Sequence, residues 1–209
     1  DRTKLAQIVK TIAADGDDFD YFGDTVAIPE EDGDTLLIAA SLDSGNGFIT
    51  GAVYVFTHDG SAWSQAQKLT QSDPEPTDRF GFSMAAAPGS VLIGGRFTES
   101  VYEFVETGGG WVQQAQIVPS APAAQATGFG FSVARRGGVA LIGAPFADPV
   151  AGSGAAFVFT RQGATWVEAA KLAVPSAAGL QLGRSTAIDG ELLIPSGTAA
   201  GSRTRRGSR

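Results

Sequence analysis

The sequence predicts an all-β protein in which four-stranded antiparallel sheets follow one another as the blades of a β-propeller. Three observations predict this fold class. A pattern of aromatic, glycine and aliphatic residues recurs along the chain, in copies of about 50 residues. Each complete copy holds four short runs of the β-branched and aromatic residues that strands favour. Glycine and proline interrupt the chain so often that no stretch of about ten residues keeps the period of a helix.

A Phe-Gly pair or its variant marks the first expected strand of each copy. After a short loop, an apolar run marks the second expected strand, at residues 36–40, 91–95, 140–145 and 192–195. Short apolar runs bounded by glycine and proline predict buried strands, and glycine near their ends lets neighbouring backbones approach closely. The four pairs are Phe22-Gly23, Phe80-Gly81, Phe129-Gly130 and Leu182-Gly183.

The last two strands of each complete copy form a predicted hairpin. A glycine follows a Phe by four residues, and it predicts a turn position with positive φ. A Trp follows the Phe by seven residues, and an aliphatic residue follows the Trp by six. Because this last spacing is even, it predicts that both residues lie on one face of the strand as core anchors. The copies are Phe56, Gly60, Trp63 and Leu69; Phe104, Gly108, Trp111 and Ile117; and Phe159, Gly163, Trp166 and Leu172.

The pattern divides the chain into about four blades. We expect repeats at about 4–69, 70–117, 118–172 and 173–196, three of them complete and the last one partial, followed by a disordered basic Gly/Ser/Arg tail at 197–209. The segment 4–9 has the pattern of an outermost strand and could close a ring with the last blade. The alternative is an open arc or a fragment of a larger propeller, whose exposed strand edges favour self-association.

Composition excludes several classes of function. The chain has no Cys and one His, His58, which excludes a disulfide framework and a thiolate nucleophile and disfavours a multi-His metal site. The net charge of −7 disfavours nucleic acid as a partner. No apolar run is long enough for a transmembrane segment, and no signal peptide is visible at the first residues.

The Phe-Gly pairs, together with Gly143-Ala144-Pro145, resemble the FG-GAP repeat over about residues 4–195. This repeat builds the β-propeller of integrin α-subunits and of many bacterial extracellular proteins, and the Lys68-Leu69 and Lys171-Leu172 pairs look like the bacterial secreted type. The resemblance implies an extracellular, non-enzymatic binding or adhesion module with a protein or glycan partner. Propellers of this family commonly hold seven blades, whereas this chain has room for about four.

Acidic residues gather near the start of the chain, where ten of the 22 fall within the first 34 positions. The resemblance implies Ca²⁺ binding in the loop between the first two strands of a blade, which here is residues 28–34. That loop has the carboxylates that Ca²⁺ prefers but not the alternating order of the family. The metal ligands predicted on this basis are Glu30, Asp32, Asp34, Asp15 and Asp17; the alternative is a solvated acidic surface.

The loops between second and third strands are predicted to lie on one rim of the propeller. Asp43 in residues 41–51 and Asp148 in residues 146–154 stand in matching loops, where they are either turn residues or binding residues. Two other functions stay open at this point. Carboxylates without His or Cys can support a propeller hydrolase or lyase, and the chain can equally be a degenerate structural fragment of a larger propeller.

Overall fold

The computed structural model describes residues 12–29, 33–45, 48–120, 128–147, 152–174, 179–189 and 192–197. All regular structure in this part is β, which confirms the predicted fold class: three four-stranded antiparallel sheets and one two-stranded sheet follow one another. The first sheet contains β1 (Phe22–Ala27), β2 (Thr35–Ala40), β3 (Ala52–His58) and β4 (Trp63–Leu69). The second contains β5 (Ser83–Ala87), β6 (Ser90–Gly94), β7 (Val101–Thr107) and β8 (Gly110–Ile117). The third contains β9 (Ser132–Arg136), β10 (Val139–Ala144), β11 (Ala155–Gln162) and β12 (Thr165–Ala173), and the fourth contains β13 (Ser185–Asp189) and β14 (Leu192–Ser196).

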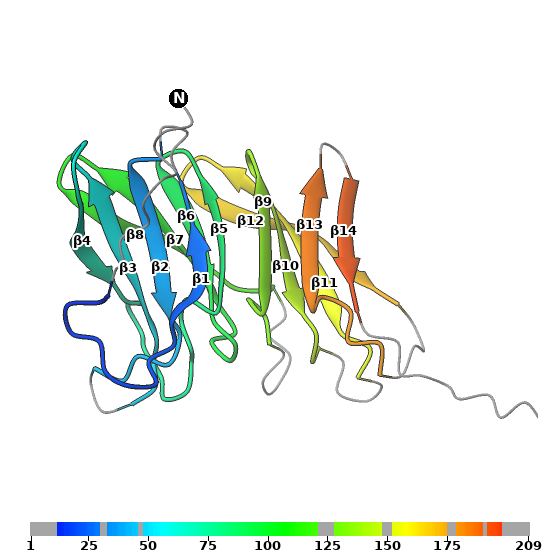
Figure 1. Ribbon diagram of the computed structural model, residues 1–209. Helices are drawn as coiled ribbons and strands as arrows, with labels where there is room; N and C mark the ends of the chain where they lie inside the picture. The colour runs from blue at the N-terminus through cyan, green and yellow to red at the C-terminus, as the bar shows by residue number, and fades with distance from the viewer. Residues whose placement is uncertain are drawn as a thin grey trace, which may run out of the picture.

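The sheets stand face to face in an open arc (Figure 1). Their first strands contact one another in the order β1, β5, β9 and β13. The first sheet and the β13–β14 pair lie at opposite ends of the arc in Figure 1. The described sheets therefore follow one another as propeller blades do, without closing a ring.

Apolar cores fill the spaces between neighbouring sheets, and the same positions recur in each core. Leu37, Leu92 and Leu141, one from each second strand, are fully buried against the following sheet. The Phe of each Phe-Gly pair packs against two aromatic rings of its own third strand; for Phe80 these are Tyr102 and Phe104, with ring centroids 5.8 and 5.9 Å away. Phe22 and Phe129 make the same two contacts in their sheets. Aromatic and aliphatic burial therefore holds the blades together in a chain that has no disulfide.

The prediction that the Trp and the aliphatic residue share one face is wrong. The pairing of the third and fourth strands shifts by one residue in each complete sheet, because the fourth strand carries a β-bulge between the two positions. The extra residue reverses the alternation of side chains beyond it. Trp111 therefore packs in the core toward the first sheet, whereas Ile117 packs in the core toward the third. In the second and third sheets the fourth strand therefore anchors its sheet to both neighbours.

The predicted positive φ at the hairpin glycines is confirmed at Gly60 (95°) and Gly163 (63°) but is wrong for Gly108. In the second sheet Gly110, two residues further on, has the positive φ, 114°. Thr107 pairs with Gly110 there, so the turn itself is Gly108-Gly109 and the positive φ falls at the start of β8.

Neighbouring sheets approach most closely at the Phe-Gly pairs. A Cβ on Gly143 would lie 2.0 Å from the carbonyl oxygen of Gly183, and a Cβ on Gly94 would lie 2.3 Å from that of Gly130. This confirms that glycine near these strand ends permits close backbone contact. A hydroxyl group bonds across each contact: Thr25 Oγ1 donates to the Phe82 carbonyl (3.1 Å), Ser83 Oγ to that of Gly130 (2.6 Å) and Ser132 Oγ to that of Gly183 (2.8 Å).

A buried ion pair joins the second and third sheets. Glu103 on β7 is fully buried, and its Oε1 lies 3.5 Å from Arg135 Nη1 and 3.2 Å from Arg161 Nη1. The Trp166 indole N–H donates to Glu103 Oε2 at 3.0 Å, and the Arg135 guanidinium stacks on the same indole. Burial lowers the pKa of Arg135. This charged cluster ties one interface together through atoms of both sheets.

The outermost strand expected at residues 4–9 lies outside the described residues, as does the basic tail from residue 198 onward. In the part of the chain that the structure describes, no helix is long and apolar enough to cross a membrane.

Candidate functional site

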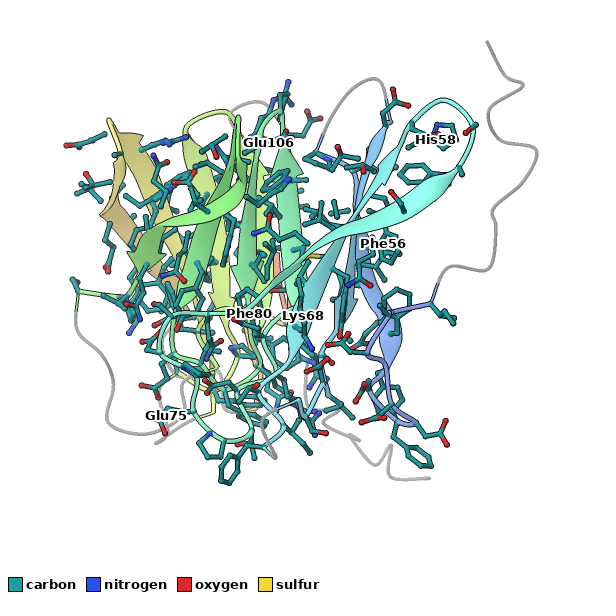
Figure 2. The ribbon with its side chains drawn as sticks, turned by 90° about the vertical axis from the view of Figure 1, so that its left-hand side faces the viewer. Phe56, His58, Lys68, Glu75, Phe80 and Glu106 are labelled. Atoms are coloured by element: carbon teal, nitrogen blue, oxygen red, sulfur yellow. The ribbon has the colours of Figure 1, made fainter. Side chains whose placement is uncertain are left out.

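The candidate site is one end of the stacked sheets, which we call the strand-end rim. It comprises the described residues of 12–21, 41–51, 70–82, 95–100, 128–131, 145–154 and 179–184, where first strands begin and second strands end. In Figure 2, Glu75 marks this end, and His58 and Glu106 mark the opposite end.

The structure separates the residues that the sequence predicted as ligands. Asp15, Asp17 and Asp43 lie on the strand-end rim, whereas Asp34 lies at the opposite end, where its carboxylate is 3.9 Å from His58 Nδ1. Glu30, Asp32 and Asp148 lie outside the described residues. The structure thus brings Asp15 and Asp43 together and keeps Asp34 away from both.

Lys68 on β4 connects Asp15 with Asp43. Its Nζ lies 2.7 Å from Asp15 Oδ2 and 2.9 Å from Asp43 Oδ2. The Tyr54 hydroxyl donates to the same Asp43 oxygen at 2.6 Å, and Asp43 is only 3% exposed. Asp43 also accepts the Gly45 N–H at 3.1 Å, which stabilises the turn at this position. The ion pair with Lys68 is a second contact of the same carboxylate.

The pKa shifts of this group follow from the same contacts. The hydrogen bond from Lys68 holds the pKa of Asp15 below its ordinary value of 3.8. Burial alone would lower the pKa of Lys68, but its hydrogen bonds with Asp15, Tyr54 and Asp43 raise it. Burial and the bond to Asp43 raise the pKa of Tyr54. The group is therefore a carboxylate–ammonium–phenol cluster in which the ammonium is strongly held as a cation.

The second sheet repeats this arrangement with different side chains. Tyr102 donates its hydroxyl to Asp73 Oδ1 at 2.8 Å, and Gln116 Nε2 donates to Asp73 Oδ2 at 3.0 Å. Gln116 pairs with Tyr102 across the strands just as Lys68 pairs with Tyr54. Asp15 and Asp73 stand at the same place in their repeats, and each connects the segment that enters its blade to the fourth strand, through Lys68 and Gln116 respectively.

A second pair of acidic residues shapes the loops before the Phe-Gly pairs. Asp20 accepts the Asp17 N–H at 2.7 Å, and Asp78 accepts the Glu75 N–H at 2.7 Å; both carboxylates are 6% exposed. The flanking residues have positive φ in both loops: Phe19 and Tyr21 in the first, and Thr77 and Arg79 in the second. These bonds offset the strain of left-handed non-glycine residues. Phe19 and Tyr21 project into solvent as a result, with exposed fractions of 85% and 63%.

The described carboxylates of the strand-end rim are engaged in contacts within the protein. Asp15 and Asp43 both pair with the Lys68 ammonium group, and Asp20 accepts a backbone hydrogen bond from Asp17 within its own loop. The described part of the chain contains no group of three or more acidic or His side chains that could hold a metal ion. The loop with Glu30 and Asp32 lies outside that part, so calcium binding there stays a prediction.

The rest of the rim carries a cluster that the sequence reasoning missed, which we call the Arg–Phe cluster. The Arg96 guanidinium stacks on Phe97 at 5.2 Å and on Phe82 at 5.8 Å, and Phe82 and Phe131 meet edge to face at 4.9 Å. Phe97 is 38% exposed. The cluster spans three successive sheets and consists of Arg79, Phe82, Arg96, Phe97, Phe131, Phe146 and Arg184.

One signal in the sequence could have revealed the cluster. Phe82 and Phe131 directly follow the glycine of a Phe-Gly pair, and Arg184 stands at the corresponding place in the fourth repeat. Side chains at matching places in successive repeats line up along a stack of blades. The pattern of buried Phe and Trp residues does not include this position, which faces the rim.

The fold and the rim define a class of protein: a repeat protein whose blades are those of a β-propeller, with its exposed chemistry on the loops at one end. A comparison with family models then identifies the family. The FG-GAP repeat model matches residues 5–56, 63–101 and 111–159, which is more than half of the chain. The chain therefore belongs to the FG-GAP repeat family. No curated protein gives a significant match to it.

Proposed function

We propose that this chain is a non-enzymatic, extracellular binding or adhesion module that takes its partner on the strand-end rim. The observation that carries this proposal is the Arg–Phe cluster. Three guanidinium groups lie over aromatic rings there, two from loops of the second blade and one from the fourth, and the rings belong to the second and third blades. The FG-GAP family, whose repeats are typical of extracellular proteins, supports the same reading.

The chemistry of the cluster indicates the kind of partner. A guanidinium that stacks on a ring keeps its N–H donors directed sideways, where they can bind a carboxylate in a bidentate manner. Exposed aromatic faces such as Phe97 add apolar contact area at low entropic cost. Loops on a rigid sheet scaffold hold these groups in place before a partner arrives. We expect a protein or glycan partner that presents carboxylates to this rim.

An array of extracellular matrix proteins and acidic glycans tests the proposal. We expect binding to a defined set of carboxylate-bearing probes, with affinity reduced about tenfold or more by Arg96→Ala or Phe97→Ala. Arg136→Ala is the matched control, because Arg136 is exposed at the opposite end of β9 and pairs there with Asp189 at 2.6 Å. Binding that all three variants retain, or no binding to any probe, would overturn the proposal.

A further inference from the structure

At each end of the arc, the terminal sheet has one face that no neighbouring sheet covers. We call the face of a sheet toward the preceding sheet its leading face and the face toward the following sheet its trailing face. The trailing face carries an aliphatic residue of the second strand that pairs with an alanine of the first strand. Three of these residues, Leu37, Leu92 and Leu141, are 0% exposed because the next sheet covers them. Ile194 on β14 pairs with Ala187 in the same way, but it is 48% exposed.

The leading face of the first sheet is uncovered at the matching place. Met84 and Val133 pair with an isoleucine of the second strand and pack in the cores against the preceding sheet. Val26 makes the same pair, with Ile38, yet Val26 is 60% exposed. Its neighbour on this face, Ile28, is 59% exposed.

The glycines give independent evidence for the same vacancy. A Cβ placed on the Phe-Gly glycine of a following sheet meets the sheet before it, at 2.9 Å for Gly81, 2.9 Å for Gly130 and 2.3 Å for Gly183. A Cβ on Gly23 would meet nothing within 4 Å. Gly23 therefore has the same positive φ as the glycines that contact a preceding sheet, but no sheet lies beside it in the described part of the chain.

The two uncovered surfaces match in extent and in polar chemistry. Tyr54 and Phe56, which lie on β3 in the leading face of the first sheet, are already buried at 0% and 3%, so the uncovered part lies on β1. The fourth sheet supplies first and second strands, which are the strands that cover this part in the other interfaces. Ser185 stands where Ser83 and Ser132 stand in the repeat, and those two hydroxyls donate to the glycine carbonyl of the following Phe-Gly pair.

We propose that the chain self-associates head to tail: the trailing face of β13–β14 in one copy binds the leading face of β1–β2 in a second copy. Ile194 then packs near Val26 and Ile28, and the Ser185 hydroxyl donates to the Gly23 carbonyl. Ser196 occupies the place of Gly94 and Gly143, and Ala39 already shows that a Cβ is tolerated there, because it faces Gly81 in the first interface. The interface is heterologous, so each copy offers one surface of each kind.

Sedimentation velocity of two charged variants tests the proposal. Val26→Asp disables only the leading face, and Ile194→Asp disables only the trailing face. The wild-type chain should associate in a concentration-dependent manner, and each variant alone should associate at least about tenfold more weakly, because docking would bury an unpaired carboxylate. An equimolar mixture of the variants should form a heterodimer and nothing larger, since one intact surface of each kind remains.

The control is Val112→Asp, a change of the same kind at an exposed residue of β8, 47% exposed and away from both faces. It should associate as the wild type does. All three positions are exposed, so thermal melting is expected to show folded variants. A wild-type monomer at every concentration overturns the proposal. Association that persists in both single variants, or a mixture that stays monomeric, overturns it as well.

Discussion

Replacing Glu103 with Val tests whether the buried ion pair stabilises the interface between the second and third sheets. Val fits the position, because Val55 and Val158 occupy it in the other two complete sheets. The change leaves the Arg135 side chain, 5% exposed, without its carboxylate. It also leaves the Trp166 N–H without its acceptor.

The size of the effect follows from how deeply each partner is buried. Removing one partner of a buried ion pair costs about 3–5 kcal/mol of unfolding free energy. Arg161 is 27% exposed and can turn its guanidinium toward water. Since only Arg135 remains trapped, we expect Glu103→Val to cost about 3 kcal/mol, the lower end of that range. Arg135→Ala removes the trapped cation, and Ala86 already stands at that place in the second sheet.

Urea unfolding of the two single variants and the double variant measures the coupling. The double variant recreates the Val–Ala combination of the first interface, so its loss should be smaller than the sum of the single losses by at least about 1 kcal/mol. Glu103→Gln, which keeps an acceptor for Trp166, should fall between wild type and Glu103→Val. Glu75→Val, on the exposed rim, is the control and should change stability by less than about 0.5 kcal/mol. Single losses that add within about 0.5 kcal/mol would refute the reasoning.

Three further predictions concern the interface glycines, the rim carboxylates and calcium. Gly143→Ala should destabilise the fold by about 1–3 kcal/mol in urea, because its Cβ meets a backbone carbonyl of the next sheet; Gly109→Ala, whose Cβ meets nothing within 4 Å, is the control, and equal losses in the two variants would contradict the prediction. The pKa of Asp15 is lowered on folding, so its stabilisation is present above its ordinary value of 3.8 and is lost as pH falls through the lower folded value. Asp15→Asn should therefore flatten that part of the acid-unfolding curve, and a curve like that of the wild type would count against the Lys68 contact. A calcium site in the 28–34 loop predicts a higher Tm in millimolar calcium than in EDTA, which Asp34→Asn removes and Asp15→Asn keeps, whereas an unchanged Tm excludes the site.

Most of the fold could be predicted because each strand has a local signature. The Phe-Gly pairs and the apolar runs predicted the first two strands of each repeat, and the Phe-Gly-Trp hairpins predicted the last two strands of each complete repeat. The faces of the fourth strands could not be predicted in this way. Ala66, Gln114 and Ala169 are the extra residues of the three bulges, and nothing in these residue types indicates a bulge. A bulge is set by how the strand pairs with its neighbour and by the packing on both faces, which single-strand periodicity does not contain.

The site was harder to predict because its contacts join residues that are far apart in the sequence. Asp15 was expected as a calcium ligand from its acidic neighbours, yet its partner Lys68 lies 53 positions away. When the repeats are aligned on their Phe-Gly pairs, Asp15 and Asp73 stand at the same position. An acidic residue at the same position in two repeats favours a structural role. The Arg–Phe cluster likewise depends on three blades standing side by side. Charge clustering along the chain was therefore a poor guide to which carboxylates are available.

The three interfaces share one geometry but differ in chemistry, and this difference specifies the order of the blades. Val55, Glu103 and Val158 occupy one position, and only the blade that follows Glu103 presents two guanidinium groups to it. If the third sheet docked on the first instead, Arg135 would be buried against Val55 with no carboxylate to pair with it, at a cost of several kcal/mol. A wrong neighbour is thus penalised even though the glycine contacts and hydroxyl bonds would fit it equally well. The uncovered Ile194 and Val26 carry no such charge, so under the proposed association the end faces select a partner by shape, apolar area and the Ser185 hydroxyl bond, without an ion pair.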